Sequence, residues 1–511
     1  MTKIIIKTIK ELTNWKESLN KNISFVPTMG NLHKGHLKLI EEANKQNSHT
    51  TIVSIFINRL QFNNKKDFKQ YPKSLTKDIE LAFKYGADAI FIPSDKEIFP
   101  KNDNEILYLK ASQKLSSTLC GIKRIGHFDG VCTVVYRLLT LIQPKILFLG
   151  EKDWQQVLIL KAMAKEMNLN IKFKSIATVR DYDGVPFSSR NNLLSKSERR
   201  MMKLFSQELL NTQNIFLGKK EVDNKEIINK LRQSKISLEY LELVNAYNLQ
   251  KTNTLGNITL LAGAIICGKA RLIDHVFLMR RKPIIAIDGP AGSGKSTVTK
   301  LIAKQLHMIY LDTGAMYRAL SWYLKKEKIN YERKIDLEET LKNISILFKS
   351  TNKSFQDVYI NNICVTEVIR SQEISSIVSS IASINEVREF LVSEQRKFGD
   401  KGGLVAEGRD IGTQVFPNAE LKIFLTASID ERAKRRKIEL ENKEDVIINF
   451  EEIKEQIKNR DLMDSTRKIS PLKKAKDAFE INTDGFSVNE IVQKIVDLYN
   501  ETIPEEVRKF K

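Results

Sequence analysis

Residues 286–300 read AIDGPAGSGKSTVTK, and this stretch decides the fold of the second half of the chain. From Gly289 to Ser296 it matches the pattern GxxxxGK followed by Ser or Thr, with an apolar strand before it and a helix after it. The glycines let successive backbone N–H groups face one anion, Lys295 reaches the terminal phosphates, and Ser296 is placed to ligate Mg²⁺. The stretch therefore predicts a nucleotide-phosphate loop, and the long segment before it needs its own explanation.

Length and composition predict several globular domains. A chain of 511 residues is too long for one ordinary core, so we expect about three folded units. No apolar run reaches the roughly 18 residues that a membrane span needs, and the N-terminus lacks the apolar core of a secretory signal. The four cysteines lie far apart with no CxxC pair, which favours free thiols. These features predict a cytoplasmic protein that does not bind a membrane.

The net charge of +21 invites a nucleic-acid interpretation, because clustered cations bind phosphate backbones. Here, however, basic and acidic residues are interspersed, as in KKDFKQYPKSLTKDIE, and there is no long basic block. Interspersed charge is typical of a solvated surface. We therefore expect anionic small-molecule substrates and no nucleic-acid partner.

Apolar and amphipathic stretches alternate along the first 187 residues. This strand–helix repetition predicts a doubly wound parallel sheet with right-handed crossovers, that is, a Rossmann-like domain. From 188 to 278 helices precede long apolar strands, which indicates a smaller α+β domain. After the short junction MRRKP the alternation restarts, so a second α/β domain is expected over 282–511. The strands expected in the first domain are 23–27, 50–57, 88–93, 145–150 and 171–179.

A GTPase is one alternative for the second half. Asp400–Gly403 reads DxxG and Asn442–Asp445 reads NKxD. The second motif lies within a charged helix-turn stretch rather than after a hydrophobic strand, and the first precedes a strand instead of following one. This context disfavours guanine recognition and leaves a small-molecule phosphotransferase.

From about Ile284 onward the chain resembles bacterial cytidylate kinase. The resemblance lies in YLDTGAMYRAL, TEVIRSQEIS, VREFLVSEQRKF, LVAEGRDIGTQVFPNAELKIFLTAS, ERAKRR and IKNRDLMDSTRKISPL, in that order after the phosphate loop. It implies a P-loop nucleoside monophosphate kinase that phosphorylates CMP or dCMP with ATP and Mg²⁺. Residues 330–388 resemble the monophosphate-binding insert of that family.

The resemblance also implies site residues. Lys295, Arg409 and Asp410 are the expected catalytic residues, and Arg435 with Arg436 resembles the lid over ATP. Thr313 stands where many relatives have Ser, and Glu407 where some have Asp. The expected ATP contacts are Gly289, Gly292, Ser293, Gly294, Lys295, Ser296, Thr297 and Arg435; the expected CMP contacts are Thr313, Arg318, Ser379, Arg388, Arg409, Asp410, Arg460, Asp464 and Arg467.

In the first half, VPTMGNLHKGHL follows the strand ISFV and opens a helix. His33 and His36 share one helix face, and a helix start favours an anion. A zinc pair and two unconnected structural histidines are the alternatives, but the chain has only six histidines and no Cys/His/Glu cluster that completes a zinc site. The pattern favours imidazoles that stabilise charge on a phosphate under attack.

The first 278 residues resemble pantothenate synthetase. The motifs are VPTMGNLHKGHL, SIFINRLQF, YPKSLTKD, GHFDGVCTVV, LFLGEKDWQQVLIL, TVRDYDGVPFSSRNNLLS and KARLIDHV. The resemblance implies condensation of pantoate with β-alanine through a pantoyl adenylate, with release of AMP and pyrophosphate. It also suggests a homodimer through the first domain.

The implied catalytic residues are His33, His36, Lys152 and Arg190. Asp153 is expected at the ribose, and Asp78 is a candidate for Mg²⁺. Phe187 replaces a common Met, and Asp129 a common Arg. The expected ATP contacts are Met29, His33, His36, Gly150, Lys152, Asp153, Val179, Ser188, Ser189 and Arg190; the expected pantoate contacts are Asn58, Gln61 and Gln156.

The two resemblances together predict a fused, bifunctional enzyme with an ATP site in each half. Two other interpretations remain open. In one, the phosphate loop serves the first active site and the chain is a single composite catalyst. In the other, one half is a degenerate binding module that the positive charge attracts to RNA, which would show as steeply salt-dependent binding.

Overall fold

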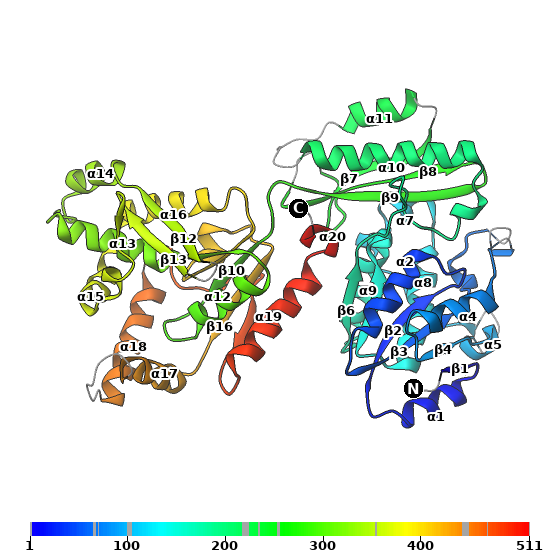
Figure 1. Cartoon of the computed structure of the whole chain (residues 1–511), viewed down its shortest axis with the longest axis horizontal. Coiled ribbons are helices and arrows are strands. Elements are labelled where there is room, and N and C mark those ends of the chain that lie inside the picture. The colour runs from blue at the N-terminus through cyan, green and yellow to red at the C-terminus, as the bar shows by residue number, and fades with distance from the viewer. Residues whose placement is uncertain are drawn as a thin grey trace. The chain divides into compact units, whose positions relative to one another are not determined.

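The computed structural model describes residues 3–64, 68–69, 71–99, 105–216, 224–233, 236–252, 256–352, 355–441, 449–467 and 469–509. They form two compact units. The first runs to Arg280 and also includes the segment from Ile503 onward; the second spans Arg281–Thr502 (Figure 1). The second unit thus ends before the C-terminus, whereas the sequence led us to expect a domain over 282–511. The NKxD motif at 442–445 lies outside the described residues.

A six-stranded parallel sheet forms the centre of the first unit, in the order β1-β4-β3-β2-β5-β6. Its central strands are rich in β-branched and aromatic residues, and Phe25, Val26, Ile52 and Val53 are fully buried. The predicted doubly wound sheet is therefore confirmed. The strands are β1 (Ile4–Ile6), β2 (Asn22–Thr28), β3 (His49–Ile55), β4 (Ala89–Phe91), β5 (Ile146–Gly150) and β6 (Lys172–Ile176).

Strand β1 was not expected from the sequence. It has three residues at the sheet edge, and Ile4 and Ile5 are exposed, so it leaves only a short and weak pattern. Helices and short turns connect the strands of this sheet. They are α1 (Ile9–Glu17), α2 (Lys34–Asn44), η1 (Arg59–Gln61), α4 (Leu75–Lys84), α5 (Asp95–Ile98), α6 (Gln113–Ser116), α7 (Cys120–Lys123), α8 (His127–Ile142), η3 (Glu151–Asp153), α9 (Trp154–Glu166) and η4 (Asn191–Leu193).

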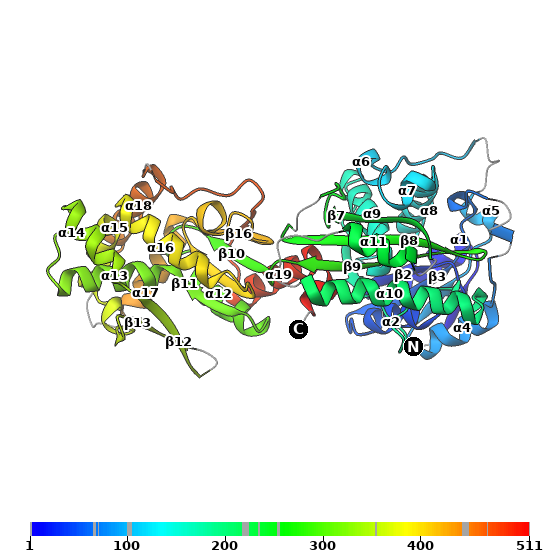
Figure 2. The same cartoon turned by 90° about the horizontal axis from the view of Figure 1, so that it is seen from above.

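The predicted smaller α+β part of the first unit is an antiparallel sheet in the order β7-β8-β9. Its long strands are β7 (Ser237–Asn245), β8 (Ile258–Cys267) and β9 (Ala270–Met279). Helix α10 (Lys196–Phe216) lies along this sheet (Figures 1 and 2), and buried Phe205 and Leu209 join its core. Helices α11 (Asn224–Gln233) and α20 (Glu505–Arg508) complete the first unit.

The second unit is built on a five-stranded parallel sheet in the order β11-β15-β10-β16-β17. The phosphate loop follows its central strand β10, as the motif predicts. The strands are β10 (Ile284–Asp288), β11 (Ile309–Asp312), β15 (Leu404–Gly408), β16 (Leu421–Thr426) and β17 (Phe479–Asn482); the helices around them are α12 (Lys295–Gln305), α13 (Thr313–Lys326), α16 (Asn385–Phe398), α17 (Ile429–Glu441), α18 (Phe450–Thr466), α19 (Val488–Thr502) and the π-helical turn η6 (Ile411–Val415).

The insert expected over 330–388 has its own antiparallel sheet, in the order β12-β13-β14. Residues of the insert share one hydrophobic core with helices α13 and α16, in which Met316, Leu320 and Leu391 are fully buried. Its elements are α14 (Lys334–Lys342), β12 (Ile346–Asn352), β13 (Phe355–Ile360), β14 (Ile363–Cys364), η5 (Val368–Arg370) and α15 (Gln372–Ile381).

The four cysteines are free; Cys364 is exposed and the other three are buried. None of the helices in the described part of the chain combines the length and the apolar character that a membrane crossing requires.

Candidate active sites

The loop between β2 and α2 is braced by Asp78 from helix α4. Its carboxylate accepts hydrogen bonds from the backbone N–H groups of Asn31 and Leu32, at 2.8 and 2.7 Å, and from the Ser74 hydroxyl at 3.0 Å. The residue is almost fully buried. Asp78 is thus engaged in holding this loop, and its role as a magnesium ligand stays a prediction.

His33 and His36 stand at the start of α2 with their rings stacked at a centroid distance of 4.0 Å. The backbone N–H of Gly35 donates to Nδ1 of His33 at 3.2 Å, and the backbone N–H of His33 donates to Nδ1 of His36 at 3.4 Å. A neutral imidazole that accepts at Nδ1 carries its proton on Nε2. Each ring therefore offers an Nε2–H donor.

Both imidazoles are neutral at physiological pH. Burial lowers the pKa of His33 to about 2, and the nearby His36 and the positive charge of Lys152 act in the same direction. Burial also lowers the pKa of His36 to about 4. The charge of Lys152 thus acts on both rings. Because the imidazoles are neutral, the permanent positive charge beside this loop comes from Lys152, which follows β5.

Gly35, directly before His36, leaves little room for a larger side chain beside the His33 ring. A Cβ on Gly35 would lie 3.0 Å from Cε1 and 3.1 Å from Nδ1 of His33. That approach is tighter than ordinary van der Waals contact, so a larger residue would displace the ring.

Two strand ends carry the other predicted ATP contacts. Gly150 is the last residue of β5, Lys152 and Asp153 follow it, and Val179 follows β6. The side-chain amide of Asn31 donates to the Ser189 carbonyl at 3.1 Å, which ties the histidine loop to the serine-rich loop. Further members of the serine-rich loop are Ser188, whose Oγ accepts from the Arg190 backbone N–H at 3.3 Å, and Phe187, whose ring lies 6.4 Å from that of His33.

The predicted pantoate contacts are partly brought together. The buried Asn58 amide donates to Gln61 Oε1 at 3.1 Å, and the Gln61 amide lies 3.1 Å from the sulfur of Met29. Gln156 is half-buried in the first turn of α9, and in the described part of the chain no hydrogen bond joins it to Asn58 or Gln61.

Sequence reasoning missed His127 and Tyr71. His127 Nδ1 lies 2.7 Å from the Gln61 carbonyl, and its Nε2 lies 2.8 Å from Nη1 of Arg124. The Tyr71 hydroxyl donates to Ser189 Oγ at 3.4 Å. His127 lies in GHFDG and Tyr71 in YPKSLTKD, so the motifs contained the signal, although neither side chain was singled out. Asp129, the departure in GHFDG, pairs with Lys110 at 3.1 Å.

In the second unit the phosphate loop wraps tightly over β16. A Cβ on Gly289 would meet the Leu425 carbonyl oxygen at 2.1 Å, so only glycine fits there. Lys295 is buried, and its ammonium donates to the Pro290 carbonyl at 2.6 Å and to Ser293 Oγ at 3.4 Å. Burial, with the positive charge of Arg409, lowers the pKa of Lys295. The amine thus lies within its own loop, held by two of the loop's oxygens.

Glu407 at the end of β15 links the phosphate loop to the start of α13. Its carboxylate accepts from Ser296 Oγ at 2.8 Å and from the Tyr310 hydroxyl, while its carbonyl accepts from Thr313 Oγ at 2.6 Å. Burial raises the pKa of Glu407, and the charge of Asp312 raises it further. Thr297 is exposed beside Ser296 at the start of α12.

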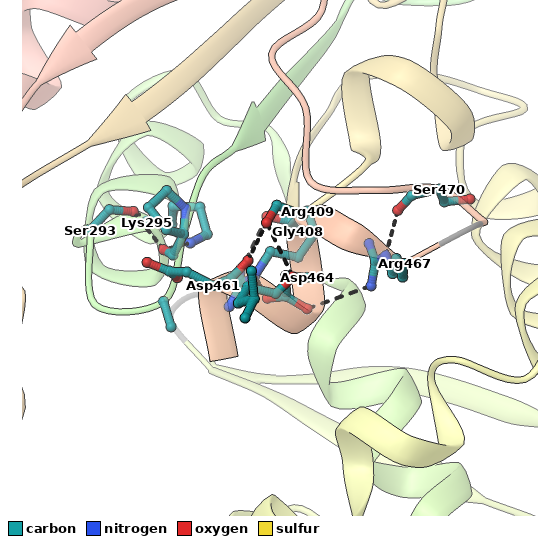
Figure 3. Close-up of polar contacts among 12 residues, drawn as sticks. Ser293, Lys295, Gly408, Arg409, Asp461, Asp464, Arg467 and Ser470 are labelled. Carbon is teal, nitrogen blue, oxygen red and sulfur yellow. Dashed lines mark hydrogen bonds and ion pairs between the residues drawn. The ribbon is translucent and has the colours of Figure 1, made fainter. Parts of the chain in front are cut away.

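Arginines from four elements converge near this loop. Arg409 Nε donates to Asp464 at 2.8 Å, and Arg467 approaches the same carboxylate at 3.6 Å (Figure 3). Arg318 pairs with Asp312 at 3.1 Å. These pairs place the sequence-predicted phosphate contacts in one cluster with Lys295.

The arginine cluster contains N–H donors for which the described residues offer no acceptor. Among the described residues, five buried guanidinium nitrogens lack a hydrogen-bond partner: Nε of Arg318, Arg388, Arg432 and Arg460, and Nη2 of Arg467. Burial and the charge of Arg409 lower the pKa of Arg460; burial and the charge of Arg388 lower that of Arg467. Buried, mutually repelling donors are suited to an anionic ligand.

The predicted cytosine contacts are joined only in part. Arg388 and Asp410 are both nearly fully buried and form an ion pair. Arg388 also donates to the Ala382 carbonyl at 3.0 Å and lies 5.5 Å from the ring centroid of Tyr317. Ser379 is half-buried on α15, and no hydrogen bond in the described chain connects it to this pair.

The lid candidates differ from one another. Arg435 donates to Glu431 at 2.9 Å and to both oxygens of Thr483, whereas Arg436 is half-buried and pairs with Glu439. The buried arginine of ERAKRR is Arg432, which the sequence did not single out.

Arg432 connects the phosphate loop to α18. It donates to the Ala291 carbonyl at 3.1 Å and pairs with Asp461 at 2.6 Å. Its sequence context is the same as that of the other basic residues of ERAKRR, and only the tertiary packing shows that Arg432 is the buried one.

Comparisons with known proteins match the two halves of the chain separately. The family model described as pantoate-beta-alanine ligase matches residues 4–277, and that described as cytidylate kinase matches 285–501. A relative from Prochlorococcus marinus subsp. pastoris, described as a bifunctional pantoate ligase/cytidylate kinase, is 64% identical over 508 residues, covering 99% of this chain and 100% of the relative. A relative of the same description from Prochlorococcus marinus strain NATL1A is 46% identical over 510 residues, 99% of each chain.

A solved structure described as pantothenate synthetase from Thermus thermophilus is 31% identical and covers 53% of this chain and 98% of its own, with a TM-score of 0.50. The histidine loop and the arginine-lined phosphate loop thus lie in segments that two family models match separately. The chain belongs to the bifunctional pantoate ligase/cytidylate kinase family.

Proposed function

We propose that each half of the chain works at its own ATP site, with the residues described above as the working groups. The first half condenses pantoate with β-alanine through a pantoyl adenylate, and the second phosphorylates CMP with ATP. The observation that carries the proposal is the presence of two differently built phosphate-binding loops in two compact units. A single composite catalyst would not need both.

In the first half a pantoate carboxylate oxygen attacks the α-phosphorus of ATP, and pyrophosphate leaves. His33 and His36 donate from Nε2 to the phosphate oxygens, which gain charge as the bond breaks. Lys152, Ser188, Ser189 and Arg190 complete the surround of the triphosphate. The amine of β-alanine then attacks the acyl carbon and displaces AMP. Asn58, Gln61, Met29 and Gln156 hold pantoate, Asp153 holds the ribose, and Gly150 and Val179 line the ATP pocket.

In the second half a CMP phosphate oxygen attacks the γ-phosphorus of ATP. Lys295 and the loop amides hold the β- and γ-phosphates, and Arg435 closes over them. The arginine cluster holds the acceptor phosphate and neutralises the charge that develops during transfer. Arg388 and Asp410 read the cytosine with Ser379, while Arg460 and Asp464 hold the sugar. dCMP is proposed as a second acceptor.

The residues at the kinase loop fit Mg²⁺. The Ser296 hydroxyl and the Glu407 carboxylate, 2.8 Å apart, are oxygen donors beside the place for the phosphates, and Mg²⁺ prefers such ligands together with substrate phosphates. When bound there, the ion neutralises phosphate charge. Ser296 and Glu407 would hold it.

The remaining expectations belong to the same proposal. The substrates are small, water-soluble molecules, most of them anionic, which supports a cytoplasmic location and gives no reason for a nucleic-acid partner. A homodimer through the first domain is proposed on the family resemblance.

The decisive experiment uses purified full-length protein in two separate assays. One supplies pantoate, β-alanine and ATP and follows AMP release; the other supplies CMP and ATP and follows CDP. We expect both products, and calorimetry with a non-hydrolysable ATP analogue should detect two classes of site. A single class of site, or the absence of either product, contradicts the proposal.

A further inference from the structure

The chain does not end with the kinase. The cytidylate kinase match stops at residue 501, and the residues from Ile503 onward belong to the first compact unit. There Ile503 is 1% exposed and Val507 is 3% exposed, and α20 packs against β6 and β9 (Figure 1). We call Ile503–Arg508 the C-terminal clasp. Its burial shows that it is an integral part of the first unit.

A reciprocal set of hydrogen bonds holds the C-terminal clasp. The Glu151 carboxylate accepts from the backbone N–H groups of Glu505 and Glu506, the latter at 2.9 Å. In return, the Glu505 carboxylate accepts from the Ala177 N–H at 2.7 Å, and the Glu506 carboxylate from the Thr178 N–H at 2.8 Å. The clasp and the strand ends of the first unit therefore each supply hydrogen-bond acceptors for backbone N–H groups of the other.

The partners of the clasp are placed next to the synthetase ATP contacts. Glu151 is the first residue of η3, which also carries Lys152 and Asp153. Ala177 and Thr178 follow β6 and lead directly into Val179. The clasp thus ties together the ends of the two neighbouring strands from which these ATP contacts project.

Glu151 depends on the clasp for most of its hydrogen bonds. It is fully buried, and apart from the clasp its carboxylate accepts from Ser175 Oγ at 2.7 Å. Without the clasp a buried carboxylate and two backbone N–H groups lose partners, and such groups reorganise to regain water. Reorganisation of Glu151 would move Lys152 and Asp153, its neighbours in the same turn.

We propose that the C-terminal clasp, which follows the kinase half, positions Lys152 and Asp153 for ATP in the synthetase half. The clasp acts through Glu151 and the 177–178 backbone, so its glutamates are positioning residues that touch no substrate. This inference rests on the proposed function of the first half. It assigns a use to a segment that lies outside both family matches.

The test compares full-length variants. In the double variant Glu505→Ala/Glu506→Ala we expect the KM for ATP in pantothenate formation to rise about tenfold, with CMP phosphorylation unchanged. Glu505→Gln/Glu506→Gln keeps an acceptor oxygen at each position and should recover most of the loss. Glu166→Ala, an exposed glutamate at the end of α9, is the matched control.

Two further measurements separate positioning from general destabilisation. A chain that stops after Thr502 should show the same defect, and an added peptide of residues 503–509 should restore ATP affinity. Hydrogen exchange at 151–153 and 177–179 should rise in the double alanine variant. This measurement reports on the clasp independently of enzyme activity. If the wild-type protein made no pantothenate, that result would count against the proposed function and not against the clasp. Unchanged KM and exchange, or an equal loss of both activities, overturns the inference.

Discussion

We propose phosphate-binding roles for both the histidine loop of the first unit and the arginine cluster of the second, but the two differ in the groups that would attract the phosphates. His33 and His36 are neutral and offer N–H donors whose direction is set by backbone hydrogen bonds. The kinase cluster instead gathers permanent charges, several of whose nitrogens have no partner among the described residues. The donors of the first site are thus oriented by the protein's own backbone, whereas several donors of the second have no partner in the described part of the chain.

This difference has a physical basis in the two reactions. Adenylation places charge on one leaving pyrophosphate, and a few oriented donors suffice. Transfer between two nucleotides brings two phosphate groups together, and only several cations can offset their repulsion. The predictions below test the separation of the two sites and then their different construction.

The largest expected effect comes from removing the loop ammonium of the kinase. Lys295→Ala should lower CMP phosphorylation roughly 10²- to 10³-fold, because the phosphate charge in the transition state loses its buried cation. Pantothenate formation should be unchanged. The two assays run on the same preparation decide this, and loss of pantothenate formation in a folded variant would show that the two sites are one.

The converse experiment targets the first site. His33→Ala should lower pantothenate formation roughly 10²-fold, since one Nε2–H donor is lost, and should leave CMP phosphorylation intact. His307→Asn is a suitable control because His307 is exposed in the second unit at φ 54, a conformation that Asn tolerates. Equal rates in wild type and His33→Ala would contradict the role of the imidazole.

The stability of the two units should respond to pH with opposite signs. Burial lowers the pKa of His33 to about 2, of His127 to about 3, and of His36 and His275 to about 4, all in the first unit. Below pH 6.5 the unfolded chain binds these protons and the folded unit does not. The free energy of unfolding of the first unit should therefore fall by up to ~1.4 kcal/mol per pH unit for each imidazole.

In the second unit burial raises the pKa of Asp288 to about 6 and also raises those of Glu407 and Glu420. The protonated form of these buried carboxyl groups stabilises the second unit at low pH, and this stabilisation is lost as the pH rises through about 6. In the first unit the pKa values of Glu151 and Glu506 are also raised, which opposes the effect of the imidazoles on stability. Because four imidazoles oppose these two carboxyl groups, we expect the imidazoles to set the sign for the first unit. Urea unfolding between about pH 7.5 and 5, read by pulse proteolysis of each unit, measures both signs; parallel responses would refute the contrast.

The smallest effect tests how firmly the imidazoles are oriented. Gly35→Ala places a methyl group about 3 Å from the His33 ring, so we expect roughly a tenfold loss in pantothenate formation with the donor still present. Gly256→Ala is the matched control, since its Cβ would meet only Thr259 Oγ at 3.7 Å. Activity of Gly35→Ala equal to that of the control would mean that the ring direction is unimportant.

The sequence by itself determined the parallel sheet of the first unit, the smaller α+β part, the α/β character of the second unit and the place of the glycine-rich loop. Those features rest on local periodicity and on glycine spacing, as at Gly289 and Lys295, which a chain expresses within a few residues. The edge strands β1 and β17 escaped notice because they are short and carry exposed residues such as Ile4 and Phe479.

Tertiary structure alone decided the partners of individual side chains. Asp78 braces a loop 47 residues away in sequence, Arg432 rather than Arg436 reaches the phosphate loop, and Glu151 meets Glu505 across 354 residues. A carboxylate or guanidinium has the same local pattern whether it is solvated or buried. Its role is fixed only when packing removes water and leaves one donor or acceptor within reach.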